Sequence, residues 1–340
     1  MLRRSLLAAI PAALAAPRLA SAQERVVNLY SSRHYDSDRA LYETFAQQSG
    51  IRIRLIEANA DQLLERIRAE GANSPADVIL TVDASRLARA AEMGLTQPVR
   101  SDAISSRIPA ELIGPEGMWF AVSRRARVLM YDRARGAPEG LARYEDMADP
   151  RFRGQFLIRS SGNGYNIALA SSFLAANGEA ATEAWARGVA ANLARPPSGG
   201  DTDQIRAMLA GQGRIALANT YYLGLLNNSQ RAEDRELAGR VAVIFPNQGD
   251  RGTHVNISGA ALVRTAPNAE NARRFLDFLT TPDAQRIFAL GNMEYPAATE
   301  AETHPFLVSL GRFKAETPDG AKLLANAPEA LRVMQRAGWR

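Results

Sequence analysis

The chain has 340 residues, no cysteine and a formal net charge of +5. This length exceeds what a single hydrophobic core ordinarily supports, so two domains are expected. The lack of cysteine excludes disulfides, zinc fingers and iron–sulfur clusters, and leaves core burial as the source of stability. Basic residues are scattered among acidic ones, which argues against a nucleic-acid-binding protein.

The first 22 residues have the pattern of a bacterial export signal. Arg3 and Arg4 precede an apolar stretch over 6–16, and small residues at 20–22 favour cleavage before Gln23. Cleavage would remove three arginines and leave a charge of +2. The arginine pair suits either the general secretory (Sec) or the twin-arginine route. Because the stretch is shorter than the roughly 20 residues of a spanning helix, we expect a periplasmic protein without stable membrane insertion.

The residues after this signal alternate between strand and helix patterns. Strands are predicted over 26–31, 51–56 and 76–80, with helices over 38–48, 61–70 and 84–92. This rhythm indicates a mostly parallel sheet with helices on both faces.

The pattern changes after Pro98. Residues 118–123 and 127–131 read as two adjacent strands with Ala126 near the turn, where the chain is expected to cross into a second lobe. Further strands are predicted over 155–159, 214–218, 241–245 and 257–263, and helices over 165–176, 179–193, 201–209, 269–279 and 282–290.

The order of these elements predicts how the chain divides. The strands at 241–245 and 257–263 should return to the first lobe, and the tail over 302–337 should pack as helices against the second lobe. The expected division is 23–122 with 250–300 for the first lobe, and 123–249 with 301–340 for the second.

Tyrosines occur in three loops that should meet between the lobes. Tyr35 follows the first predicted strand, Tyr165 follows the strand over 155–159, and Tyr221 and Tyr222 follow the strand over 214–218. Loops at the carboxyl ends of strands form the ligand site in open α/β sheets. His34 adds an imidazole beside Tyr35.

Phenol oxygens favour a hard, highly charged cation. A phenol has a pKa near 10, so it becomes an anionic ligand at neutral pH only where a strongly polarising cation displaces its proton. Hard metals select oxygen donors. Ferric ion is therefore the obvious candidate.

Three segments carry a resemblance to a known family: 27–35 (VNLYSSRHY), 71–78 (GANSPADV) and 219–222 (NTYY). The mature chain resembles the periplasmic ferric-ion-binding proteins of bacterial ABC iron importers, in the branch where a tyrosine follows the first-lobe histidine. The resemblance implies an α/β, transferrin-like, class II periplasmic binding protein fold with a ligand cleft between two lobes. It also implies Fe³⁺ as the transported ligand, an inner-membrane ABC permease as partner, and a monomer that is not an enzyme.

Carried over position by position, the resemblance implies Tyr35, Tyr165, Tyr221 and Tyr222 as metal ligands, with His34 as a fifth candidate.

The chain departs from another branch of this family. That branch has a glutamate ligand where this chain has Val82, and the adjacent Asp83 reads as a helix cap. Four phenolates already exceed the charge of a trivalent ion, so an added anion is not expected. Arg127 is a candidate to offset the excess.

Two other functions remain open from the sequence. A two-lobed binder could take an organic ligand such as a polyamine, thiamine or a phosphonate, with tyrosines stacking on it. An exported enzyme would need a positioned nucleophile or base, and the sequence shows no Ser-His-Asp order, Walker loop or HExxH helix.

Overall fold

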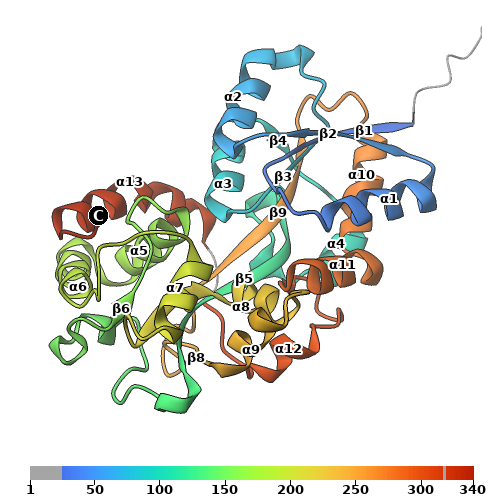
Figure 1. Ribbon diagram of the computed structural model, residues 1–340. Coiled ribbons are helices and arrows are strands. Elements are labelled where there is room, and N and C mark those ends of the chain that lie inside the picture. Colours follow the sequence, from blue (N-terminus) through green and yellow to red (C-terminus); the bar gives the residue numbers. More distant parts are fainter. Residues whose placement is uncertain (1–24, 317–318) are drawn as a thin grey trace, which may run out of the picture.

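The computed structural model describes residues 25–316 and 319–340, so the predicted export signal lies outside the described residues. The chain forms two α/β lobes that are joined by two long strands, β5 (Phe120–Asp132) and β9 (Val255–Val263) (Figure 1). Within the two described ranges, no helix has the length and apolar character needed to cross a membrane.

The first lobe confirms the predicted alternation of strands and helices. Its elements are β1 (Val26–Ser31), α1 (Asp38–Ser49), β2 (Arg52–Glu57), α2 (Ala60–Glu70), β3 (Val78–Thr81), α3 (Ala84–Glu92), β4 (Thr96–Gln97), α4 (Asp102–Arg107), α10 (Ala269–Leu279), α11 (Pro282–Asn292) and β10 (Tyr295–Pro296). Most of their buried apolar side chains form one cluster that includes Leu29, Leu41 and Phe275, whereas Tyr295 of β10 packs in a cluster with second-lobe residues.

The second lobe is built mainly of helices around short strands. Its elements are β6 (Phe156–Leu157), α5 (Gly164–Asn177), α6 (Glu179–Ala191), α7 (Asp201–Leu209), β7 (Ile215–Asn219), α8 (Thr220–Asn227), α9 (Ala232–Arg240), β8 (Val241–Ile244), α12 (Pro305–Ser309) and α13 (Gly320–Arg336). Short 3-10 helices cover Gly71–Asn73, Ala110–Leu112, Pro115–Gly117, Arg133–Arg135, Glu145–Ala148 and Pro150–Phe152. Two further apolar clusters lie in this lobe, around Phe173 and around Met208.

The sheet is mixed, and the prediction of a mostly parallel sheet is wrong. Its strand order is β2-β1-β3-β9-β5-β7-β6. Strand β1 pairs parallel with β2 and β3, and β6 pairs parallel with β7. The crossing strands run the other way, since β9 is antiparallel to β3 and β5, and β5 is antiparallel to β7. These crossing strands have no counterpart in the local βα rhythm that the sequence displays.

The predicted turn near Ala126 is also wrong, because β5 runs through it as one strand. Arg125 and Arg127, on either side of Ala126, interrupt the apolar pattern of this strand. Both are buried within the strand, where Arg125 faces Glu294 and Arg127 pairs with Asp201.

Strand β8 does not return to the first lobe as predicted. It pairs antiparallel with the second-lobe half of β5, from Leu129 opposite Ile244 to Asp132 opposite Val241. Of the two strands expected to return, β9 alone does so.

Helix α13 packs against both lobes, whereas the prediction placed it against the second. Gly320 at its start lies so close to the Ala84 carbonyl that a Cβ would stand 2.8 Å from that oxygen. Leu323 joins the first-lobe cluster, whereas Val333 near its end joins a second-lobe cluster. Pro328 stands inside the helix between these two regions.

Trp339 anchors the end of the chain, and its removal should destabilise the fold. The side chain is fully buried, packs edge-on against Trp185 with ring centroids 5.9 Å apart, and donates its indole N–H to the Arg159 carbonyl at 2.9 Å. Trp339→Ala should lower the free energy of unfolding by about 3–5 kcal/mol, as measured by urea denaturation. Trp339→Phe, which keeps most of the packing, should lose less, and equal losses would contradict burial as the main contribution.

Candidate metal centre

Three loops place the predicted tyrosines. Tyr35 lies between β1 and α1. Tyr165 begins α5, where the side chain of the capping residue Asn163 accepts its backbone N–H at 3.2 Å. Tyr221 and Tyr222 lie in the first turn of α8, directly after β7. Each tyrosine is thus held at the end of a strand or the start of a helix, as the sequence predicted.

The structure brings these four tyrosines together. The hydroxyl oxygens of Tyr165 and Tyr221 are 3.0 Å apart. The Tyr35 ring meets the Tyr221 ring edge-on, with centroids 6.5 Å apart. The rings of Tyr221 and Tyr222 lie 4.1 Å apart, although adjacent helical residues point about 100° apart. The two lobes therefore contribute to a single phenol cluster.

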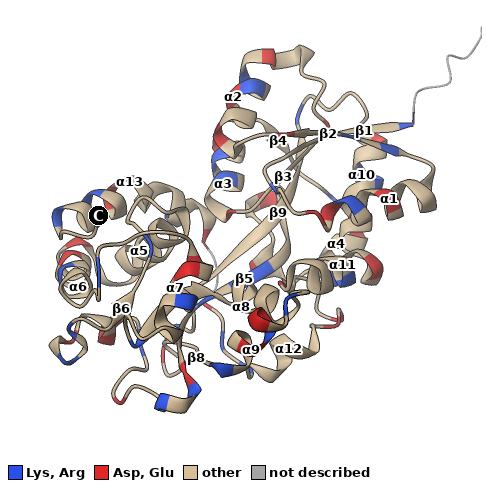
Figure 2. Ribbon diagram, in the orientation of Figure 1, with Lys and Arg blue, Asp and Glu red and all other residues tan. Residues whose placement is uncertain are grey.

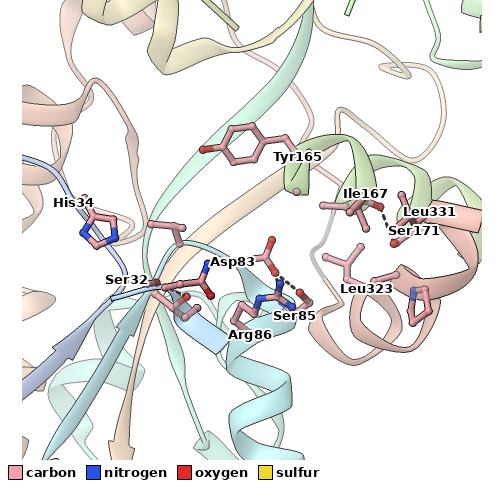
Figure 3. A pocket seen from close by; sticks show the side chains of 18 residues that line it. Ser32, His34, Asp83, Ser85, Arg86, Tyr165, Ile167, Ser171, Leu323 and Leu331 are labelled. Carbon is pink, nitrogen blue, oxygen red and sulfur yellow. Dashed lines mark hydrogen bonds between the residues drawn. The ribbon is translucent and has the colours of Figure 1, made fainter. Parts of the chain in front are cut away.

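His34 lies at the edge of this arrangement. Its side chain is 57% exposed, and its Nδ1 atom is 4.0 Å from a Glu57 carboxylate oxygen. It lines a cavity of about 480 Å³ together with Tyr165. Figure 3 shows the Tyr165 ring reaching from the start of α5 toward the side of the cavity where His34 stands. His34 is thus near the tyrosines but remains open to solvent.

Asp83 lines the same cavity, and the structure confirms it as a helix cap. Its side chain accepts the Ser85 backbone N–H at 2.7 Å at the start of α3, and the Asn256 amide donates to it at 2.7 Å. Its carboxylate is therefore engaged in local structure. Val82 also lines the cavity, at the position where a glutamate ligand was considered.

Burial favours the protonated form of Tyr35, Tyr221 and Tyr222 in the metal-free protein. It raises the pKa of Tyr35 above its ordinary value of 10, and the Glu294 carboxylate adds to that rise. Burial and the neighbouring Tyr165 raise the pKa of Tyr221 well above 10, and they raise that of Tyr222 to about 12. A cation that binds these oxygens must therefore be polarising enough to displace their protons.

Four arginines surround the phenols: Arg33, Arg125, Arg127 and Arg159. The Arg33 guanidinium carbon lies 4.7 Å from the centroid of the Tyr35 ring. The corresponding carbons of the other three lie 5.7, 5.8 and 5.9 Å from the Tyr165 ring. Such positive charge stabilises phenolates that form on metal binding.

The arginine predicted to offset the phenolate charge has a partner of its own. Arg127 pairs with the buried Asp201 carboxylate at 2.5 Å and donates to the Asn166 side-chain oxygen at 2.8 Å. Asp201 also accepts the backbone N–H of Asn219, just before α8. Arg127 and Asp201 therefore brace the start of the Tyr221 helix.

Sequence reasoning missed Arg125, a buried arginine with two unused donor atoms. It is 1% exposed, and its Nε and Nη2 atoms are buried without a hydrogen-bond partner. Burial alone would lower the pKa of Arg125, but its neighbours Tyr165, Glu294, Tyr35 and Tyr221 raise it above the ordinary value for arginine. The available signal was a charged residue inside an apolar run, which read as a turn.

Oxygen donors are what this centre offers a metal. No group of three or more His, Cys, Asp or Glu side chains suited to a metal ion occurs within 25–316 and 319–340. Figure 2 shows basic and acidic residues interspersed over both lobes rather than gathered in one patch. The phenol cluster offers oxygen atoms, the donor type that hard cations select, with arginines beside them.

Known proteins share the sequence and the fold of this chain over most of its length. Iron uptake protein A1 of Synechocystis is 47% identical over 318 residues, which are 94% of this chain and 88% of the relative. Major ferric iron-binding protein of Neisseria meningitidis is 26% identical and matches 100% of this chain and 99% of the relative. A structure of the Trichodesmium protein IdiA (FutA) with iron and citrate ligands is 47% identical, with a TM-score of 0.87 over 93% of this chain and 100% of that one.

These matches confirm the predicted two-lobed fold. Residues 73–318 also match the family described as bacterial extracellular solute-binding protein. The chain is therefore a member of the bacterial extracellular solute-binding protein family.

Proposed function

We propose that this protein captures Fe³⁺ in the periplasm and delivers it to an ABC permease of the inner membrane. The observation that carries the proposal is the pair of hydroxyl oxygens of Tyr165 and Tyr221, 3.0 Å apart, with the rings of Tyr35 and Tyr222 beside them. Relatives over nearly the whole chain are named for iron uptake and ferric iron binding, which supports the same cargo.

Tyr35, Tyr165, Tyr221 and Tyr222 are the proposed ligands, and His34 is the proposed fifth donor. Tyr165, Tyr221 and Tyr222 belong to the second lobe, whereas Tyr35 follows β1 in the first. A metal ion could first bind the three second-lobe tyrosines, and closure of the lobes would then add Tyr35 and His34. The proposed lobes keep the predicted division, with 250–300 in the first and 301–340 in the second.

The setting of this function follows from the family. Its members are solute-binding proteins rather than enzymes, and relatives such as the Fe(3+)-binding periplasmic protein of Serratia marcescens are named as periplasmic. We propose the same compartment after export by the Sec or twin-arginine route, a monomeric carrier, and a permease that accepts the loaded, closed form.

An organic ligand is the competing proposal. One relative that is 26% identical is named a putative 2-aminoethylphosphonate-binding periplasmic protein. A cleft for such a zwitterion would need a carboxylate free to pair with its amine, whereas Asp83, the carboxylate lining the cavity, is engaged by Ser85 and Asn256. The colour of the metal-loaded protein separates the two proposals, because phenolate bound to ferric ion absorbs visible light.

Replacing Tyr221 and Tyr222 together by phenylalanine should abolish tight iron binding. Changes to residues that only hydrogen-bond to a metal ligand cost about 10–100-fold in metal affinity, so the loss of two direct donors should lower the affinity by more than about 100-fold. The measurement is the orange-red band on loading with ferric citrate, with affinity from competition against nitrilotriacetate. Tyr42→Phe is the matched control, because Tyr42 is a tyrosine that packs against Phe275 in the first lobe. An unchanged band in the double variant would refute the site.

Iron binding should weaken as the pH falls. The pKa of Tyr35 and Tyr221 is raised above 10, and that of Tyr222 is about 12, so these phenols carry protons throughout the physiological range. Each phenolate that forms on metal binding releases one proton, which lowers the affinity about tenfold per phenolate for each pH unit of acidification. A pH-stat titration with ferric nitrilotriacetate, corrected by a chelator blank, should show three to four protons released. Fewer than two would contradict the phenolate ligand set.

His34→Ala should separate binding from stability. Because the side chain is 57% exposed, its removal should change the free energy of unfolding by no more than about 0.5 kcal/mol. Iron affinity should nevertheless fall, because the variant lacks the imidazole that closure of the lobes would add to the metal. Affinity equal to that of the wild type, measured by the same competition, would remove His34 from the ligand set.

A further inference from the structure

Glu294 is a buried carboxylate next to the two arginines, Arg33 and Arg125, that contact the tyrosine rings. It has no solvent exposure, and it lies in the turn between α11 and β10. Its Oε2 atom accepts hydrogen bonds from Arg33 at 3.2 Å and from the Ser123 hydroxyl at 2.8 Å. Its Oε1 atom is 3.5 Å from Arg125 and has no hydrogen-bond partner. A buried carboxylate in this environment compensates the charge of the arginines that face it.

The two arginines beside Glu294 also contact the phenol rings. Arg33 contacts the Tyr35 ring, and Arg125 contacts the Tyr165 ring. Both donate to the Ser258 hydroxyl on β9, at 2.5 Å from Arg33 and 3.1 Å from Arg125. Glu294 therefore reaches the tyrosines through a guanidinium on each side.

The backbone around Glu294 is fixed by elements of both lobes. Met293, the preceding residue, has a left-handed conformation with φ of 54° and is fully buried. Its side chain packs against Gly224 on α8, where an added Cβ would stand 2.5 Å from the Met293 Cβ. Gly224 lies one turn after Tyr221 on the same helix. The carboxylate is thus held at a fixed place relative to that tyrosine.

The charges around the cluster balance for a trivalent ion. Four phenolates and Fe³⁺ carry a net charge of −1. The arginines that contact the phenol rings and the acids paired with them contribute +1: Arg33, Arg125, Arg127 and Arg159 with Asp38, Glu294 and Asp201. With the phenolates, this set is therefore neutral around a trivalent ion and carries −1 around a divalent one. Excess charge in a buried site is costly.

We propose that Glu294 is a positioning residue that sets the selectivity of the site for trivalent over divalent ions. It acts by holding Arg33 and Arg125 next to the phenolates and by offsetting one of the two positive charges of these arginines. The inference rests on the proposed iron-binding function. Without the carboxylate charge, the site would carry +1 with a trivalent ion and would be neutral with a divalent one, so the preference would shift toward the divalent state.

Glu294→Gln tests this directly. The amide keeps an acceptor for Arg33 and Ser123 but loses the charge. The ratio of affinities for Ga³⁺ and Zn²⁺, two ions without redox chemistry here, should fall at least about tenfold, because one unit charge within a buried site is worth that much at protein dielectric values. The midpoint potential of the iron-loaded protein, measured by spectroelectrochemistry, should become more positive. An unchanged ratio and potential would overturn the proposal.

Two further variants separate charge from structure. Glu294→Asp keeps the charge, so it should retain the wild-type potential even where the melting temperature falls. A raised potential in this variant would overturn the proposal. The aspartate variant therefore tests the proposal even if the glutamine variant does not fold. Glu316→Gln removes a partly buried carboxylate that pairs with His254, and it should leave the potential and the affinity ratio unchanged. A wild-type protein without the orange-red ferric complex would instead refute the iron-binding function itself.

Discussion

The structure depends on burying phenols and arginines together where β5 and β9 cross between the lobes. Hydroxyls and guanidinium groups lose their hydration there, so each must find a partner inside the protein. Asp38, Glu294 and Asp201 supply carboxylates to the arginines, while the tyrosines face one another. The same burial raises the pKa of Tyr35, Tyr221 and Tyr222, so only a strongly polarising cation displaces their protons.

Local sequence patterns predicted the parts of the structure that depend on local physics. The strands and helices of the first lobe followed from apolar periodicity, and the cap at Asp83 followed from its place before a helix. The convergence of Tyr35, Tyr165 and Tyr221 could be inferred because each follows a strand, and strand ends gather at one edge of a sheet. Their role as ligands came from the chemistry of phenols and from family resemblance.

Non-local pairing explains what the sequence did not reveal. An arginine in an apolar run reads as a loop unless its buried acid is known, and the partners of Arg125 and Arg127 lie far away at Glu294 and Asp201. The same uncertainty split β5 at Ala126 and hid the mixed direction of the sheet. Burial and charge balance are properties of the assembled site, so neither can be read from spacing along the chain.

Helix α13 has a mechanical consequence for a carrier that opens and closes. One end of the helix is fastened to the first lobe at Gly320 and Leu323, and the other to the second lobe at Val333. Rotation of one lobe relative to the other must therefore bend this helix or break the packing contacts at one of its ends. Pro328 lacks the N–H that would complete the helical ladder there. The helix therefore lacks one of its backbone hydrogen bonds between its two attachments, and a bend that accompanies lobe rotation would be easiest there.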